Sequence, residues 1–277
     1  MKKRWKGVLV TSGILAAVGA GMCVSAAVIG VNRSEIPFGI LPHVQWLHKE
    51  EAAFQERTGN SMHLGNFSGI NSLDVRAEAM EVEVKKGTDK AQQIQIDTRN
   101  VNTDTELEVE KDGTTLVVHS EKESKNQWQD DSDAAVIITV PDGMTFDEVK
   151  GSAGAGAIWF EELRCQNLDI DVGAGAVDAD TFSAGKIQIE CDAGSVELCN
   201  GNSPSDISVS CSAGGVTLEL SGKRFQYDYQ MKASVGDISI DGESVTSVIQ
   251  GKFDQDHGTG KRIEADCMAG SIEFLFE

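Results

Sequence analysis

The side chains that could carry catalysis or bind a metal are scattered along this chain without the spacing that either needs. The five histidines are His43, His48, His63, His119 and His257. No His-Glu-x-x-His, phosphate-loop or dinucleotide-type glycine motif accompanies them. The run Asp130–Asp133 offers oxygens that suit Ca²⁺, but it lacks the ligand spacing and closing Glu of a helix–loop–helix site. We therefore predict no catalytic, cofactor-binding or metal-binding residues, no cofactor, and no enzymatic activity.

Acidic residues and two tryptophans leave weaker possibilities open. Asp169, Asp171, Glu190 and Asp192 could recruit cations or include a sugar-cleaving carboxylate pair. Alternating strands place polar residues outward in any case. We therefore prefer the interpretation that these carboxylates are solvent-facing strand residues without a catalytic or binding role. Trp128 and Trp159 are candidate platforms for stacking on sugar or peptide.

The cysteines follow a repeat rather than a pairing pattern. Cys191, Cys211 and Cys267 each lie three residues before a glycine of that repeat, where another unit has Val172. We expect a buried column of small apolar side chains and free thiols. One Cys191–Cys211 disulfide remains the alternative, since neighbouring units could bring the two within reach. Cys165 and Cys199 are expected in outer turns, and Cys23 lies in an apolar segment.

The repeat itself consists of two alternating strands around a glycine, usually in an Ala-Gly pair. Apolar residues occupy positions −7, −5, −3, +2 and +4 relative to the glycine in most units, and polar residues lie between them. A period near 20 with two strands per unit predicts an all-β, parallel β-helix (β-solenoid) with coils of about 19–20 residues, right-handed by the general chirality of parallel connections. The central glycines, each expected to take a positive φ in a turn, are Gly156, Gly175, Gly194, Gly214, Gly236 and Gly270.

Sequential stacking of these units predicts how the coils end and where they vary. The final Phe274-Leu-Phe is expected to cap the far end. Residues 244–253 could form a degenerate coil without its glycine. We expect the surrounding insertion, residues 241–262, to contact a partner, because loops that vary on one edge are where solenoids usually bind.

The beginning of the chain indicates a membrane protein. Residues 1–6 are basic and form a predicted cytoplasmic tail, and residues 7–31 are uncharged and long enough for a transmembrane helix. A cleaved signal peptide, with Val24-Ser25-Ala26 at the cleavage site, is the alternative. We assign residues 32–68 to a juxtamembrane stalk, 69–148 to a strand-rich N-terminal part of the ectodomain and 149–277 to the solenoid. The C-terminal domain would lie outside the cell, behind a single-pass anchor.

Charge narrows the range of partners. Lys and Arg total 24 and Asp and Glu total 44, a formal net charge of −20. Such a surface repels nucleic acid and anionic lipid and favours cationic ligands. A plainer interpretation is that the excess acid keeps an extended β protein soluble.

The repeat units, most visibly 187–198 and 207–218, resemble those of the putative-adhesin family of bacterial β-strand-repeat proteins. The resemblance covers residues 70–277 and implies a parallel β-helix displayed outside the cytoplasmic membrane, with no functional residues to transfer. We therefore predict a non-enzymatic, membrane-anchored extracellular module for adhesion or interaction, with an unknown protein or cell-wall ligand. The alternative, from relatives implicated in envelope-stress signalling, is a sensing component that acts through a membrane partner and captures cationic peptides.

Overall fold

The computed structural model describes residues 61–88, 93–101, 105–122, 134–202, 204–246 and 251–277. These belong to one compact unit, residues 57–277. The predicted tail and anchor, Trp128 and Asp130–Asp133 lie outside the described residues. Among those described, no helix is long and apolar enough to cross a membrane.

The building block of this unit is a pair of strands joined by a tight turn, which we call a coil. Seven coils occur among the described residues. In chain order their strands are β2 (Ser72–Ala77) and β3 (Glu81–Lys86), β8 (Phe146–Ala153) and β9 (Ala157–Phe160), β10 (Leu163–Val172) and β11 (Ala176–Ala179), β12 (Phe182–Cys191) and β13 (Ser195–Gly201), β14 (Asp206–Cys211) and β15 (Gly215–Leu220), β16 (Asp228–Ala233) and β17 (Asp237–Ile240), and β20 (Arg262–Cys267) and β21 (Ser271–Phe276).

Coils stack by parallel strand pairing, with equivalent repeat positions in register. Leu168 of β10 pairs with Ile187 of β12, and Val177 of β11 pairs with Val196 of β13. Alternate side chains point inward, so the apolar residues of both strands close on one continuous core. The structure is thus all-β and mostly parallel, as the repeat predicted.

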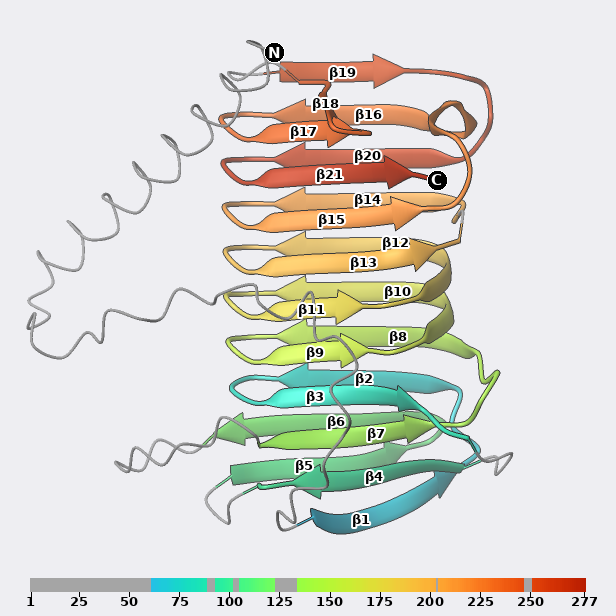
Figure 1. Ribbon diagram of the computed structural model, residues 1–277, viewed down its shortest axis with the longest axis vertical. Coiled ribbons are helices and arrows are strands. Elements are labelled where there is room, and N and C mark those ends of the chain that lie inside the picture. Colours follow the sequence, from blue (N-terminus) through green and yellow to red (C-terminus); the bar gives the residue numbers. More distant parts are fainter. Residues whose placement is uncertain (1–60, 89–92, 102–104, 123–133, 203, 247–250) are drawn as a thin grey trace, which may run out of the picture. The chain divides into compact units, whose positions relative to one another are not determined.

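The order of the coils in the stack departs from their order in the chain. The β20–β21 coil lies between β14–β15 and β16–β17 and pairs with both (Figure 1). In the same way, the β2–β3 coil lies between β8–β9 and the pair β6 (Thr115–Lys122) and β7 (Ala135–Val140). Sequential stacking was therefore a wrong prediction. Phe274 is an internal residue, fully buried, and its strand is no terminal cap.

The coil formed by β2 and β3 escaped the sequence reasoning because it lacks the glycine. Leu73, Val75, Ala77, Val82 and Val84 nevertheless occupy positions −7, −5, −3, +2 and +4 around Met80, and all five are buried. The apolar spacing alone was the signal that could have found it. This coil joins the predicted N-terminal part to the repeats, and β8 runs across the boundary drawn between residues 148 and 149.

Antiparallel strands flank the parallel coils. Beyond β6–β7 lie β4 (Gln93–Arg99), which pairs with β7, β5 (Thr105–Asp112), which pairs with β6, and β1 (Ser61–Ser68), which pairs with β4. β1 lies within the range assigned to the stalk. Beyond β16–β17 lie β18 (Glu243–Ser244) and β19 (Gly251–Gln255), both antiparallel. The proposed degenerate coil at 244–253 is thus wrong, because these strands reverse direction. The described residues also include a short 3₁₀ helix, η2 (Arg224–Gln226), before β16.

Candidate functional site

The turns of successive coils form one edge of the stack, which explains why they need glycine. A Cβ built on Gly175 would lie closer than 3.0 Å to the carbonyl oxygen of Gly156 in the coil beneath. Gly194, Gly214, Gly270 and Gly236 meet the corresponding backbone atoms in the same way. None of the six repeat glycines has a positive φ, so that expectation was wrong. The missing Cβ serves close backbone stacking rather than a left-handed turn.

Met80 marks the place where this constraint is relaxed. A Cβ on Gly156 would strike the Met80 carbonyl oxygen, so the coil above Met80 needs its glycine. Beneath Met80 the neighbouring strands are β6, which ends at Lys122, and β7, which begins at Ala135. Met80 keeps a side chain there and buries most of it.

Beneath the turn edge lies the column predicted from position −3. Val172 pairs with Cys191, Cys191 with Cys211, and Cys211 with Cys267, each on a neighbouring strand. All four side chains are buried. The stacking order brings Cys267 next to Cys211, although Gly236 and its coil come between them in the sequence. The three cysteines are free thiols in the structure.

Each sulfur in the column lies under the glycine of the next coil. A Cβ on Gly214 would be 2.6 Å from Cys191 Sγ, and a Cβ on Gly270 would be 2.7 Å from Cys211 Sγ. The hydrogen bond to Cys211, followed by burial, raises the pKa of both Cys191 and Cys267. The pKa of Cys211 is lowered, because both neighbouring thiols and two backbone N–H groups hydrogen-bond its sulfur.

The other two described cysteines lie in strands rather than in outer turns, contrary to expectation. Cys165 lies in β10 and is buried, which raises its pKa to about 12. Cys199 lies in β13 and is half-buried. Burial and the charges of Glu219 and Glu197 raise its pKa to about 12. Neither environment favours a thiolate.

The outward side chains form two faces with different charge. We call the outward side of β9, β11, β13, β15, β21 and β17 the acidic face, because these six strands contain no lysine or arginine. We call the outward side of β8, β10, β12, β14, β20 and β16 the mixed face. There Lys150 pairs with Glu148, Lys186 with Asp206, and Arg262 with Glu264. The predicted carboxylates Asp169, Asp171 and Glu190 belong to the mixed face, and Asp192 lies in the turn that follows it.

A row of half-buried side chains crosses the centre of the acidic face. Trp159, Asp178, Glu197, Thr217 and Glu273 are register partners on consecutive strands of the stack. Burial, followed by the charges of Glu197 and Asp180, raises the pKa of Asp178 to about 6. The indole N–H of Trp159 donates to Asp180 over 3.0 Å and holds the ring on this face. The row places the carboxylates of Asp178 and Glu197 on adjacent strands, with Glu273 beyond Thr217 and no cation from these strands.

Glu83 occupies the equivalent position in β3, next to Trp159, but in different surroundings. Its carboxylate accepts from Arg99 over 2.5 Å and also contacts the Lys85 ammonium group. Burial opposes ionisation of Glu83, yet these two cations lower its pKa. The acidic row is therefore neutralised where it reaches the β2–β3 coil.

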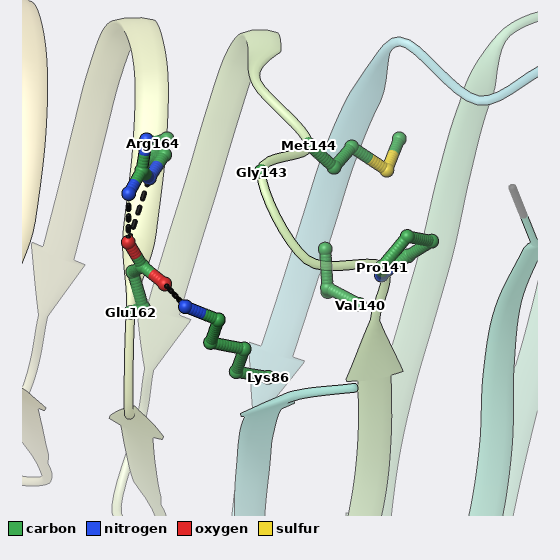
Figure 2. Close-up of a pocket in the computed structure, with 7 residues that line it drawn as sticks. All are labelled: Lys86, Val140, Pro141, Gly143, Met144, Glu162 and Arg164. Carbon is green, nitrogen blue, oxygen red and sulfur yellow. Dashed lines mark hydrogen bonds and ion pairs between the residues drawn. The ribbon is translucent and has the colours of Figure 1, made fainter. Parts of the chain in front are cut away.

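A small hollow lies at the edge of the stack opposite the glycine turns. There β3, the connection between β7 and β8, and the start of β10 meet (Figure 2). Lys86 Nζ lies 2.9 Å from Asp142 Oδ1 and 3.0 Å from Glu162 Oε2. Arg164 donates to the other oxygen of Glu162. These contacts raise the pKa of Lys86 and lower those of Asp142 and Glu162. Because these charges satisfy one another, the hollow is a structural junction, and no pattern of residues in the sequence indicated it.

The described histidines lie on separate elements. His63 of β1 bonds Asp97 over 2.8 Å, His119 lies in β6, and His257 lies in the loop before β20. His43 and His48 lie outside the described residues. Within the part of the chain that the structure describes, no group of three or more His, Cys, Asp or Glu side chains could hold a metal ion.

The described part of the insertion predicted to contact a partner, residues 241–246 and 251–262, packs on the end of the stack. Phe253 of β19 contacts Tyr229 with ring centroids 5.9 Å apart. The following loop wraps the carboxylate of Asp228, which accepts from the backbone N–H groups of His257 (2.7 Å), Thr259 (3.4 Å) and Gly260 (3.2 Å). Desolvation tends to raise the pKa of Asp228, but these backbone hydrogen bonds outweigh it and lower the pKa.

Comparison with known families decides the identity of this stack of coils. The model of the family described as Toastrack DUF4097 matches residues 70–198 and 142–273. The chain belongs to the Toastrack DUF4097 family. The resemblance seen in its repeats is thereby confirmed. No curated protein matches the chain.

Several solved structures are similar at low identity. One is a putative cell adhesion protein from Clostridium sporogenes, with 14% identity and a TM-score of 0.44, covering 79% of this chain and 100% of that one. A putative adhesin from Bacteroides fragilis has 14% identity and a TM-score of 0.41, covering 78% and 97%. A putative lipid binding protein from Parabacteroides distasonis has 12% identity and a TM-score of 0.39, covering 79% and 97%.

Proposed function

We propose that this Toastrack DUF4097 protein is a non-enzymatic interaction module that binds a positively charged partner on its acidic face. The observation that carries the proposal is the row from Asp178 to Glu273, where half-buried carboxylates lie without a cation from their own strands. Proteins normally neutralise such rows internally, as the mixed face does with its ion pairs. A cationic ligand would relieve the repulsion that the fold leaves in place.

The parallel pairing gives this face a fixed spacing. Each acidic-face strand from β9 to β21 is bonded to a strand on both sides, so Asp178 and Glu197 are held one strand separation of about 4.8 Å apart, and Glu273 lies two strands beyond Glu197, with Thr217 between them. A rigid, regular array suits an extended partner with repeated positive groups, either a protein or a wall polymer. The excess acid also argues against nucleic acid as the partner.

The proposed setting is the outer side of the cytoplasmic membrane. Residues 7–31 would form a single-pass anchor, with residues 1–6 inside and the coils outside. The coil would be right-handed, by the general chirality of parallel connections. In this setting the acidic face meets wall components or the surfaces of other cells, which is consistent with an adhesive role.

The test compares matched variants of the two faces. Full-length protein in membrane vesicles is titrated with a labelled oligolysine peptide and with isolated cell wall, at low and high salt. Glu197→Gln and Glu273→Gln should weaken binding several-fold, and added salt should weaken it further. Glu190→Gln and Glu264→Gln, on the mixed face, should leave it unchanged. Equal loss from both pairs, or binding insensitive to salt, would show that the acidic face is not the site.

The same face has a defined pH dependence. Because the pKa of Asp178 is about 6, its charge is complete only above that pH. Binding should therefore weaken as pH falls from 7 to 5, and Asp178→Asn should flatten that part of the profile. A profile unchanged by the substitution would remove Asp178 from the site.

Envelope-stress sensing is the second candidate, favoured by the same cation-free face. In this candidate function, a captured cationic peptide would be reported through a membrane partner. Crosslinking the full-length protein in its own membrane, with and without a cationic peptide, distinguishes the two. A peptide-dependent membrane partner supports sensing, whereas recovery of wall polymer alone, unchanged by peptide, supports adhesion.

A further inference from the structure

The three stacked thiols are the most unusual chemical feature of the described core. Cys191, Cys211 and Cys267 lie on β12, β14 and β20, which are neighbours in that order. Cys211 lies in register with both of the other cysteines. The arrangement depends on intercalation of β20–β21, since sequential stacking would place β16 next to β14.

The geometry allows Cys211 to link to either neighbour but not to both. Parallel strands are separated by about 4.8 Å, which lies within the range of about 4.4–6.8 Å that Cα atoms joined by a disulfide span. In-register pairs do not offer the ideal torsion, so the bond would be strained and readily reduced. Cys191 and Cys267 are separated by the whole of β14, which excludes a bond between them.

The surroundings of Cys211 favour its thiolate over those of its neighbours. Cys211 is the central member of the column, in register with a cysteine on each side, and its pKa is lowered whereas those of Cys191 and Cys267 are raised. The thiolate is the nucleophile in cysteine oxidation, so Cys211 is the residue expected to react first. Its cover on the turn side is Gly270, which has no side chain. A small oxidant therefore has only a backbone layer to pass when a coil opens locally.

We propose that Cys211 is the shared centre of an oxidative modification site, which forms one disulfide with either Cys191 or Cys267 on reaction with a hydroperoxide. The Cys211 thiolate attacks one peroxide oxygen, the O–O bond breaks, and the sulfur becomes a sulfenic acid; with hydrogen peroxide, a proton and the leaving hydroxide form water. The thiol sulfur of the neighbouring cysteine then attacks the sulfenic-acid sulfur. The S–S bond forms as the S–OH bond breaks, and the departing hydroxide takes the proton of that neighbouring thiol to give a second water.

The two products would fasten different parts of the stack. A Cys211–Cys267 bond ties the intercalated β20 to β14, whereas a Cys191–Cys211 bond ties β12 to β14. In each case the third cysteine stays reduced. Thiol–disulfide exchange through Cys211 can convert one product into the other without another oxidant.

The experiment treats the folded full-length protein with hydrogen peroxide, blocks free thiols with N-ethylmaleimide, and maps disulfides by non-reducing peptide mass spectrometry. Wild type should lose two thiols per chain and give both linked peptides, and dithiothreitol should restore the thiols. Cys191→Ala should leave only Cys211–Cys267, and Cys267→Ala only Cys191–Cys211. Cys211→Ala should abolish both, while Cys199→Ala, a matched control, should change nothing.

Outcomes that overturn the proposal are equally specific. A Cys191–Cys267 bond, a disulfide that persists in Cys211→Ala, or a folded protein that keeps all its thiols would each do so. If Cys211→Ala fails to fold, as judged by circular dichroism, the two other single variants still decide the matter. Each of them must yield its one named bond, and a variant that yields none contradicts the shared role of Cys211.

Discussion

The β2–β3 and β20–β21 coils are inserted between neighbours that are closer to each other in sequence, yet they solve the same packing problem with different residues. At the turn, β2–β3 has Met80 where β20–β21 has Gly270. Three residues later, Glu83 forms a half-buried ion pair with Arg99, whereas Glu273 lies on the acidic face. The comparison teaches that the coil beneath, rather than the coil's own repeat pattern, determines which residue a position tolerates.

The dependence of neighbouring strands also differs. β6 and β7 keep β5 and β4 as partners when β2–β3 is disturbed. β16 and β17, by contrast, have only the short β19 and β18 besides β20–β21. Damage to β20–β21 should therefore spread further than equal damage to β2–β3.

The largest expected effect comes from the core of the intercalated β21. Phe274→Ala should lower the free energy of unfolding by about 3–5 kcal/mol, because it empties a fully buried ring. Val84→Ala, the same position in β3, should cost roughly 2 kcal/mol for two buried methyl groups. Chemical denaturation measures both.

Hydrogen exchange sharpens this prediction. Phe274→Ala should also reduce the protection of amides in β16 and β17, while Val84→Ala should leave β6 and β7 protected. Equal spreading from the two coils would contradict their different dependence on neighbours.

The turn residues provide the second contrast. Gly270→Ala should cost about 3 kcal/mol, because its Cβ would overlap the Gly214 carbonyl oxygen, a backbone atom that cannot move freely. Met80→Leu, which keeps a Cβ and a similar volume, should cost less than about 1.5 kcal/mol. Thermal unfolding measures both effects. Equal melting temperatures for the two variants would contradict the claim that backbone stacking excludes a Cβ at Gly270.

The third contrast concerns the two glutamates. Glu83→Gln should cost about 1–3 kcal/mol at neutral pH, because Arg99 and Lys85 lose a buried carboxylate. Since the pKa of Glu83 is held below 4.5, this stability is present above that pH and is lost as pH falls through the lowered pKa. Glu273→Gln should be neutral or slightly stabilising. Denaturation curves at pH 7 and pH 3 test both, and a larger loss for Glu273→Gln would reverse the comparison.

The smallest effect is expected at the entry to β20. Asp228→Asn should lower Tm slightly, because the amide replaces one acceptor oxygen for the loop N–H groups with a donor. The lowered pKa of Asp228 means that the wild type should lose this advantage in acid as the carboxylate is protonated. Variant and wild type should thus converge at low pH, and a gap that persists there would argue against the carboxylate's role.

The coils could be predicted from the sequence because alternating apolar residues determine them locally. The −3 column of Val172, Cys191, Cys211 and Cys267 followed from the same spacing. The stacking order could not be predicted, because every coil presents a similar apolar interior and similar edges to its neighbours. The row on the acidic face could not be predicted either, because the stacking order determines which strands lie beside those of Trp159, Asp178 and Glu273. Met80 was missed because the glycine was used as the marker of a coil.

The intercalated β20–β21 coil also has a consequence for biosynthesis. A polypeptide leaves the ribosome from its N-terminus, so residues 228–240 are exposed before the strands that flank them exist. Until residues 262–276 follow, β16 and β17 lack the parallel partners that the structure describes for them. Their apolar side chains therefore stay exposed to solvent or are bound by a chaperone during that time. A translation product interrupted after residue 261 would therefore lack the β20–β21 coil and would also leave the β16–β17 coil without its parallel partner. We expect the apolar surface exposed in this way to promote aggregation and degradation of the fragment.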